Sequence, residues 1–277
     1  MDDFKDAGQV TRINPTGPII ALSTLLAGGG IIAFFFMSGR SATVTPTPVE
    51  TAAPTETPAP PAPADLGKDA ANGAEKITLP PLDQSDDAVR KLVEGISSRP
   101  EIARWLMTDA LIRRFVAVVD NVADGLSPRT HVSHIGPQIP YAPEQRQGVF
   151  YANPTDYARY DNVADVFCAL DPKGTAALYH QCKPLIDEAY KELGYPDKSF
   201  DVTLTRAIHH LLETPVVEGD VELVPRLASF KYYDPKLEGL SLAQKHLLRM
   251  GPDNVRRIEA QLRRIAGQLG IPPSDLP

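Results

Sequence analysis

The stretch PIIALSTLLAGGGIIAFFFM, residues 18–37, decides the architecture of this chain. It carries no charged side chain, and a helix of about twenty residues is roughly 30 Å long, which matches the apolar core of a bilayer. We therefore expect a transmembrane helix at 18–37. A buried core helix and a cleavable signal peptide are the alternatives. The polar flanks disfavour the first, and the length of the run and the poor cleavage site at Gly39-Arg40-Ser41 disfavour the second.

Basic residues near the predicted span indicate its orientation. Lys5 and Arg12 precede the span, whereas Arg40 is the basic residue that closely follows it. Because basic residues favour the cytoplasmic side, we expect residues 1–17 to form a cytoplasmic tail and the C-terminal domain to lie in the periplasm. The predicted location is the inner (cytoplasmic) membrane, crossed once, with the lipid bilayer as a partner through residues 18–37.

Proline, threonine and alanine dominate the segment after the span, which reads SATVTPTPVETAAPTETPAPPAPA from position 41. Such a sequence buries too little apolar surface to offset the entropy lost on ordering. We therefore expect residues 38–76 to be a disordered, extended linker. A folded domain at 77–270 and a C-terminal tail at 271–277 complete the predicted organisation.

The composition narrows the possible functions. The chain has 277 residues, a formal net charge of −7 and a pI near 5.4, which argues against nucleic acid as a partner. Two cysteines, Cys168 and Cys182, are too few for a disulfide scaffold. In a helical hairpin their axial offset is about 10 Å, more than a disulfide spans, so we expect both to be free.

Apolar residues recur at helical spacing through most of 77–270. The predicted fold class is therefore mostly α, a compact multi-helix domain with at most a small β-hairpin. Capping residues indicate helix starts at Ser85, Thr108, Asn153, Asp171 and Ser241. The helices that follow Asn153 and Asp171 are expected to form an antiparallel hairpin.

Two segments break the helical pattern. Residues 127–149 are rich in proline, glycine and glutamine, and a loop of this length in a compact domain is usually functional or mobile. Residues 216–233 contain short β-prone pieces, and Pro225 limits any sheet that they form.

The sequence YARYD at 157–161 forms a polar and aromatic cluster, with Tyr157, Arg159, Tyr160 and Asp161 as candidate interaction residues. It fits either a ledge for a ligand or the edge of a core in which the tyrosine hydroxyls are bonded, and the second is the commoner case.

The last predicted helix, PDNVRRIEAQLRRIAGQL at 252–269, repeats apolar residues at three- and four-residue spacing. Four arginines flank this seam: Arg256, Arg257, Arg263 and Arg264. Either the domain core covers the seam and the arginines are solvated, or the helix docks a partner and the arginines meet acidic groups or anionic headgroups.

Sequence motifs for catalysis, metals and cofactors are missing. No Gly-rich phosphate loop, GxSxG, HExxH or CxxC occurs. His131 and His134 form an HxxH in a predicted loop without a third ligand, and His209 with Glu213 is a common structural pair on a helix. We therefore predict no catalytic residue, no metal site and no cofactor, although an enzyme assembled from distant residues would leave no such motif.

Several segments resemble a bacterial family, domain of unknown function 3014. They are LPPLDQSD at 79–86, FVAVVDNVADG at 115–125, DYARYD at 156–161, YKELGYPDKSF at 190–200, HHLLETPVVEG at 209–219 and LLRMGPDNVRRI at 247–258. The resemblance covers about 79–266 and implies a membrane anchor and spacer before the domain. It implies no activity, ligand or catalytic residue.

These observations lead to three hypotheses. The first is an inner-membrane-anchored envelope protein that acts as a non-catalytic interaction or scaffold module with an envelope protein partner. The second is a binding domain for a small envelope ligand, which would use the 127–149 loop and YARYD. The third is an unrecognised hydrolase.

Overall fold

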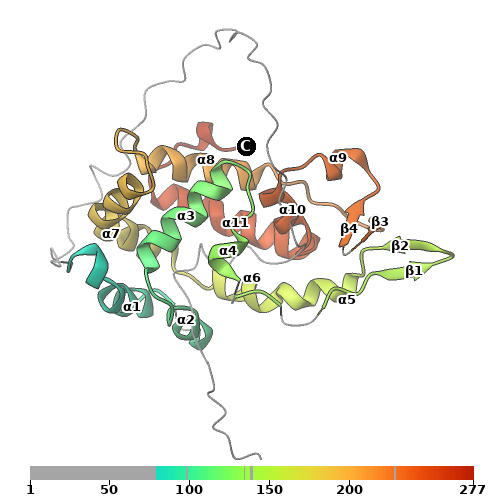
Figure 1. Ribbon diagram of the computed structural model, residues 1–277, viewed down its shortest axis with the longest axis horizontal. Helices are drawn as coiled ribbons and strands as arrows, with labels where there is room; N and C mark the ends of the chain where they lie inside the picture. The colour runs from blue at the N-terminus through green and yellow to red at the C-terminus, as the bar shows by residue number, and fades with distance from the viewer. Residues whose placement is uncertain (1–78, 98, 134, 138–139, 228) are drawn as a thin grey trace, which may run out of the picture.

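The computed structural model describes residues 79–277 except positions 98, 134, 138, 139 and 228 (Figure 1). The predicted cytoplasmic tail, the predicted span at 18–37 and the predicted linker at 38–76 lie outside the described residues. Within the described part of the chain, no helix is both long and apolar enough to cross a bilayer.

The described part is mostly helical, as the apolar spacing predicted. Its α-helices are α1 (Asp86–Glu94), α2 (Pro100–Trp105), α3 (Leu111–Ala123), α4 (Arg129–Val132), α5 (Pro154–Tyr157), α6 (Asp161–Cys168), α7 (Pro172–Glu192), α8 (Phe200–Leu212), α9 (Pro235–Glu238), α10 (Leu242–Leu248) and α11 (Pro252–Gln268). Short 3-10 turns lie at η2 (Leu82–Gln84), η3 (Ala158–Tyr160) and η4 (Pro273–Asp275).

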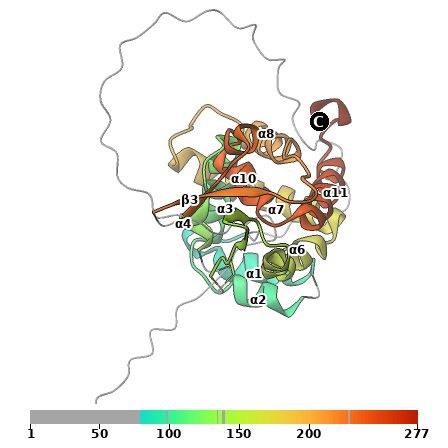
Figure 2. The same ribbon diagram turned by 90° about the vertical axis from the view of Figure 1, so that its right-hand side faces the viewer.

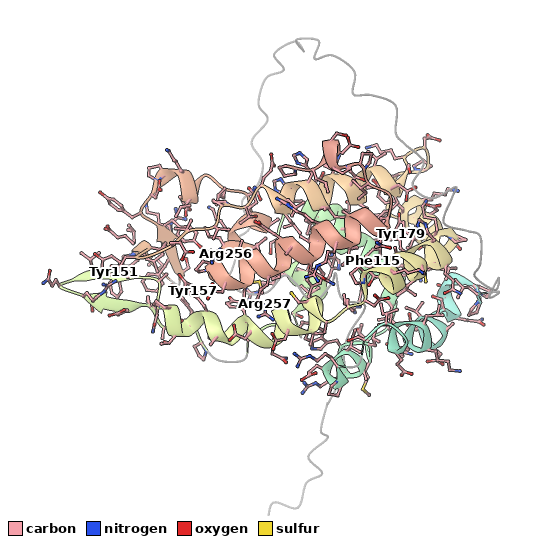
Figure 3. The ribbon with its side chains drawn as sticks, turned by 180° about the vertical axis from the view of Figure 1, so that it is seen from behind. Phe115, Tyr151, Tyr157, Tyr179, Arg256 and Arg257 are labelled. Carbon is pink, nitrogen blue, oxygen red and sulfur yellow. The ribbon has the colours of Figure 1, made fainter. Side chains whose placement is uncertain are left out.

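Helix α11 lies at the centre of the helical body, where it contacts α6, α7, α8 and α10 (Figures 1 and 3). The side chains of its seam are at most 2% exposed: Val255, Ile258, Leu262, Ile265 and Leu269. The domain core therefore covers the seam, as the first of the two interpretations held, and the seam offers no surface to a partner. Helix α3 packs across α7 and α8 on the other side of the body.

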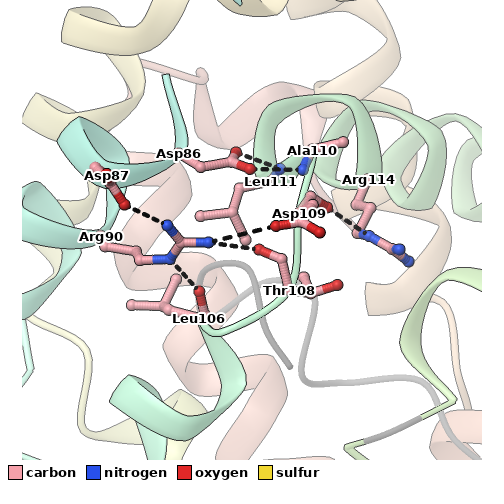
Figure 4. Close-up of polar contacts among 9 residues, drawn as sticks. All are labelled: Asp86, Asp87, Arg90, Leu106, Thr108, Asp109, Ala110, Leu111 and Arg114. Carbon is pink, nitrogen blue, oxygen red and sulfur yellow. Dashed lines mark hydrogen bonds and ion pairs between the residues drawn. The ribbon is translucent and has the colours of Figure 1, made fainter. Parts of the chain in front are cut away.

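The joint between α1, α2 and α3 is held by a cap that comes from another helix (Figure 4). The Asp86 carboxylate in α1 accepts hydrogen bonds from the backbone N–H groups of Ala110, at 2.7 Å, and Leu111, at 2.9 Å, at the start of α3. Arg90 donates to the carbonyl oxygens of Leu106 and Thr108 at 2.6 and 2.9 Å. These bonds satisfy the exposed amides and carbonyls at two helix ends.

Of the predicted helix caps, Thr108 is wrong, whereas Ser85 stands at the N-cap position of α1 but lacks the side-chain bond. Thr108 does not cap α3, because Asp86 takes that role from a distance of more than twenty residues in sequence. Ser85 makes no cap bond to α1, and its hydroxyl instead donates to the Leu82 carbonyl oxygen at 2.8 Å. The caps at Asn153, Asp171 and Ser241 are confirmed, since each side chain accepts a backbone N–H of the helix that it begins.

The β structure is larger than the small hairpin that the sequence predicted. Strands β1 (Glu144–Arg146), β2 (Val149–Tyr151), β3 (Glu222–Arg226) and β4 (Ser229–Tyr232) form one antiparallel sheet in the order β1-β2-β3-β4. The sheet lies at one end of the helical body, and in Figure 2 strand β3 crosses in front of the helices.

Strand β1 lies inside the segment 127–149 predicted to be a loop, as does α4, and β2 begins at its last residue. Each strand has three residues, which is too short for a period of two to show in the sequence. Gln147 and Gly148 join them with φ values of 50° and 84°, and a two-residue turn with two positive φ values suits the twist of a hairpin. Pro225 is tolerated because its nitrogen points away from β4, towards the edge of β3 where the pairing with β2 has already ended.

The predicted hairpin of the helices after Asn153 and Asp171 is also wrong. The first helix is divided into α5, η3 and α6, and both α6 and α7 pack mainly on α11 rather than on each other. The helix that completes this layer comes from the C-terminal part of the chain, which local spacing does not reveal. Cys168 is half-buried, Cys182 is buried and both are free, as predicted.

Candidate functional site

A pocket lies where the sheet meets the helical body. It is lined by side chains of the sheet, of the segments that flank it, of α5 and η3, and of the α10–α11 junction: Tyr141, Ala152, Tyr157, Arg159, Tyr160, Val217, Val221, Leu223, Phe230, Tyr232, Leu248, Arg249 and Pro252. The cavity volume is about 40 Å³, within about 630 Å³ of empty space that includes the open mouth. A cavity of that size holds about three water molecules.

The sheet supplies one wall of the pocket through residues of a single face. Leu223 pairs with Tyr232 across β3 and β4, and Phe230 lies two residues from Tyr232 on the same strand, so the three share a face. Leu223 and Tyr232 also belong, with Val221 and Leu248, to a small apolar cluster that is separate from the main core. The pocket therefore opens between two cores rather than within one.

Tyr157 supplies a second wall and is held against the start of α11 (Figure 3). A Cβ atom added to Gly251 would lie 2.4 Å from the Tyr157 Cγ atom, so the ring packs directly on the glycine backbone. Gly251 has φ 84° and ψ 160°, a conformation that is essentially restricted to glycine. The sequence Gly251-Pro252 thus both begins α11 and makes room for the ring.

Arg159 is a rigid part of the wall. Its side chain is 7% exposed, and its guanidinium lies 5.3 Å from the ring centroids of both Tyr141 and Tyr160. Its Nε atom donates to the Asp156 carbonyl oxygen at 3.0 Å and lies 3.6 Å from the Asp156 carboxylate. That carboxylate also accepts the Ala142 N–H at 2.8 Å, which fixes the loop that carries Tyr141.

Five polar groups of the pocket make no side-chain hydrogen bond or ion pair with any other residue that the structure describes. They are the guanidinium of Arg249 and the hydroxyls of Tyr141, Tyr157, Tyr160 and Tyr232. None of these polar atoms is among the fully buried side-chain atoms that lack a partner, so water in the pocket can reach them. Groups that converge on a cavity without a partner are therefore free to bind something that enters it.

The pKa values of the tyrosines show that these hydroxyls stay neutral. Burial raises the pKa of Tyr232 to about 12, although the positive charge of Arg249 opposes this shift. Burial also raises the pKa of Tyr141, Tyr157 and Tyr160. Each hydroxyl therefore remains both a donor and an acceptor at neutral pH.

The structure separates the members of the YARYD cluster. Tyr157, Arg159 and Tyr160 line the pocket together with Tyr141 from the 127–149 segment, the combination that the ligand-binding hypothesis named. Asp161 lies outside it and accepts a hydrogen bond from the Asn254 amide at 2.8 Å.

Two of the four candidate arginines of α11 form ion pairs with the described residues, and two do not. Arg256 forms ion pairs with Glu218 and Asp253, and Arg257 pairs with Asp165. Arg263 and Arg264 are exposed and form no ion pair with the described residues. Figure 3 shows Arg256 and Arg257 on the turn of α11 nearest the pocket end of the helix.

Sequence reasoning missed Arg249 and Tyr232. Arg249 follows the last turn of α10, where a basic residue is ordinary because it suits the helix dipole. Tyr232 ends a four-residue strand that alternation is too short to reveal. The one available signal was Gly251-Pro252, which marks a sharp turn beside both the arginine and Tyr157.

Two serine–histidine pairs bear on the hydrolase hypothesis. The Ser127 hydroxyl lies 2.8 Å from His246 Nε2, and the Ser241 hydroxyl lies 2.7 Å from His210 Nε2. Both serine oxygens also accept the backbone N–H of a following turn, from Arg129 at 3.3 Å and from Gln244 at 3.1 Å. Ser241 caps α10, and Ser127 accepts a turn bond from two residues further on, so local backbone bonding accounts for both serines and neither pair by itself supports a nucleophile.

The same serines join α10 to the rest of the body. Gly125, with φ 69°, comes so close to Ser241 that an added Cβ would lie 3.0 Å from the serine Cβ.

Among the described residues no group of three or more histidine, cysteine or acidic side chains is placed to hold a metal ion. His209 lies 3.7 Å from Glu213 on the surface of α8.

Comparison with known proteins places the chain in a family. Residues 111–266 match the model of a family described as protein of unknown function (DUF3014). The match covers more than half of the chain and includes every residue that lines the pocket. No curated protein and no solved structure matches the chain. The chain therefore belongs to the DUF3014 family of proteins of unknown function.

Proposed function

We propose that this protein is a non-catalytic binding module of the bacterial envelope, and that its domain holds a small ligand in the pocket beside the sheet. The observation that carries the proposal is the convergence of Arg249 and four tyrosine hydroxyls, all without partners among the described residues, on one cavity. Aromatic walls with a few converging polar groups are the usual composition of a ligand site.

The pocket changes the order of the hypotheses that the sequence left open. The interaction hypothesis rested on the linker, the missing catalytic motifs and the basic terminal helix, and the domain core covers the apolar seam of that helix. The ligand hypothesis rested on YARYD and the 127–149 segment, and both contribute to the pocket. Ligand binding is therefore the function that the geometry supports best.

The proposed setting is the inner membrane, with 18–37 as a single span and 38–76 as a linker that lets the domain work at a distance from the bilayer. The charge-free span and the basic residues before it support this setting. A reporter fused after Ala64 should be active if it works in the periplasm. Activity there of a reporter that works only in the cytoplasm would reverse the proposed orientation.

A blocked pocket tests the ligand proposal. Val217 lines the pocket and is half-buried, so Val217→Trp should fill it, while Val202→Trp on α8 adds the same ring at a position that is 43% exposed. The full-length chain is screened by thermal shift against fractions of an envelope extract, since a ligand that binds the native state stabilises it.

We expect at least one fraction to stabilise the unaltered chain and Val202→Trp but not Val217→Trp. Stabilisation that persists in Val217→Trp would place the ligand elsewhere. If no fraction stabilises the unaltered chain, the small-ligand proposal fails.

A second candidate function is docking of an acidic partner on the exposed arginines of α11. Arg263 and Arg264 favour it because they have no ion pair within the described chain, whereas Arg256 and Arg257 do. Arg263→Gln with Arg264→Gln should reduce crosslinking to an envelope protein in cells without changing the melting temperature. The matched double change at Arg256 and Arg257 should lower the melting temperature instead, and equal crosslinking in both doubles would exclude this surface.

A further inference from the structure

We infer that the ligand of this pocket carries one oxyanion head, a carboxylate or a phosphate, which Arg249 binds, on a short apolar body that packs against the sheet. The inference rests on the proposed function, because it names the class of ligand that the same pocket would hold.

The charges of the pocket favour a single negative charge on the ligand. Arg159 and Arg249 line the cavity, and the carboxylate that faces them is that of Asp156, which lies 3.6 Å from Arg159. Lys245 and Glu238, behind Tyr232, form an ion pair at 3.2 Å and cancel each other. Two positive groups and one negative group leave an excess of one positive charge.

Arg249 differs both from the surface arginines that pair with a carboxylate and from Arg263 and Arg264, which form no ion pair with the described residues but are exposed and do not line the pocket. Arg113, Arg146, Arg206 and Arg257, for example, each pair with a carboxylate of the protein. Arg249 lines a cavity and has no such carboxylate among the described residues. A guanidinium in this state presents a planar set of donors that matches the two oxygens of a carboxylate or phosphate.

The tyrosine hydroxyls complete the surroundings of an oxyanion. Arg249 lines the same pocket as Tyr232, Tyr160 and Tyr141. Its charge lowers the pKa of all three phenols against the larger opposing effect of burial. A neutral phenol donates a hydrogen bond, and bonds to a charged acceptor are the strong ones. Arg159 contributes charge but keeps its own partner at Asp156.

The size of the pocket indicates which part of the ligand enters the cavity and which part stays near its mouth. About 40 Å³ of cavity accommodates a group about as large as three waters, which suits a carboxylate or a phosphate rather than a whole metabolite. Val217, Val221, Leu223 and Phe230 line the same pocket and offer apolar contacts. The ligand body therefore packs on these side chains towards the open mouth.

Small probes that differ in charge but share an aromatic ring test whether the pocket recognises a negative charge on the ligand. Benzoate and phenyl phosphate carry an oxyanion on an apolar ring, whereas benzamide has the shape of benzoate and no charge. The dissociation constants of the three are measured by ligand-detected NMR on the full-length chain and on Val217→Trp. We expect benzamide to bind at least about tenfold more weakly than the better anion, because a bond to a charged group is lost.

Arg249→Gln should remove this preference, so that the better anion and benzamide bind the variant equally. Arg249→Lys should retain part of it, and Arg104→Gln, at an exposed arginine on α2, should leave it unchanged. If Arg249→Gln fails to fold, Tyr232→Phe serves as the second variant and should weaken the anion but not benzamide. The better of benzoate and phenyl phosphate identifies which oxyanion the pocket prefers.

Two results would overturn the inference. If benzamide binds as tightly as both anions, and Val217→Trp abolishes its binding, the pocket binds ligands without reading charge, so the proposed function survives and the inference fails. If neither anion binds the unaltered chain better than it binds Val217→Trp, the anion site is excluded. The extract screen then decides the proposed function separately.

Discussion

The tyrosine hydroxyls inside the helical body and those along the pocket beside the sheet differ in their partners, and Tyr160, a main-core residue that lines the pocket, belongs with the second group. In the main core the Tyr190 hydroxyl bonds Thr203 at 2.8 Å and the Tyr179 hydroxyl donates to Asp201. Beside the sheet, the hydroxyls of Tyr141, Tyr157 and Tyr232 line a cavity and bond no described residue.

The two regions therefore serve different roles in the domain, one structural and one available for binding. A region that bonds its own polar groups gains rigidity, whereas a region that leaves them unbonded keeps them for another molecule at some cost in stability. The domain tolerates this loss of stability because α11 begins at the edge of the pocket and is fixed in the main core.

The largest effect is expected for an aspartate placed in the main core. Leu262 is 2% exposed on α11, and Leu262→Asp should cost about 5 kcal/mol or more, enough to unfold the domain, because it buries a charge. Leu223→Asp, at 6% exposure beside the pocket and its arginines, should cost only about 2 kcal/mol. Urea unfolding measures both, and equal losses would erase the distinction between the two regions.

Gly251→Ala should follow at about 3 kcal/mol, because alanine strains at this φ and ψ and displaces the Tyr157 ring. Gly267 lies on the same helix with no atom within 4 Å of an added Cβ. Gly267→Ala should therefore raise stability by about 0.5–1 kcal/mol. Thermal unfolding measures the two changes, and the same sign for both would contradict the packing of Tyr157 on Gly251.

Buried His246 should make stability depend on pH. Its burial, with the charges of Arg249 and Arg129, lowers its pKa from 6.5 to about 3 in the folded chain. The unfolded state therefore binds the proton first, so stability is full above pH 6.5 and falls as the pH drops towards 3. Between pH 7 and pH 5 the loss is about 2 kcal/mol.

His246→Gln isolates this contribution, because it removes the titrating group and keeps a polar side chain beside Ser127. The fall in unfolding free energy between pH 7 and pH 5 should be about 2 kcal/mol smaller in the variant than in the unaltered chain. An unchanged pH dependence would mean that His246 titrates normally in the folded state.

The smallest changes in the free energy of unfolding are expected when single tyrosine hydroxyls are removed. Tyr190→Phe removes a bonded hydroxyl and should cost about 1 kcal/mol, while Tyr232→Phe removes an unbonded one and should stay within about 0.5 kcal/mol of zero. Tyr233→Phe, on a side chain that is 63% exposed, provides the surface reference. A cost at Tyr232 equal to that at Tyr190 would show that its hydroxyl has a structural partner.

Local signals predicted much of the helical body. The apolar spacing located α3, α7, α8 and α11, and the capping residues Asn153, Asp171 and Ser241 marked true helix starts. The prediction failed where a distant residue decided the structure. Asp86 caps α3 from another helix, and α11 separates α6 from the hairpin expected with α7.

The site was predictable only in part, for the same reason. Tyr157, Arg159 and Tyr160 stand together in the sequence and drew attention as a polar and aromatic cluster. Arg249 and Tyr232 reach the same cavity through the turn at Gly251 and through strand pairing, and neither shows in local spacing. A cluster in sequence thus revealed one wall of the pocket, and the fold supplied the others.

The position of α11 in the chain has a consequence for synthesis. Helices α6, α7, α8 and α10 all precede α11, yet each packs against it. A ribosome that adds 5–20 residues per second takes roughly 5–20 s to proceed from the end of α6 to the end of α11. During that interval the apolar faces that α11 will cover lack their partner, so the nascent domain needs protection from aggregation until its last long helix emerges.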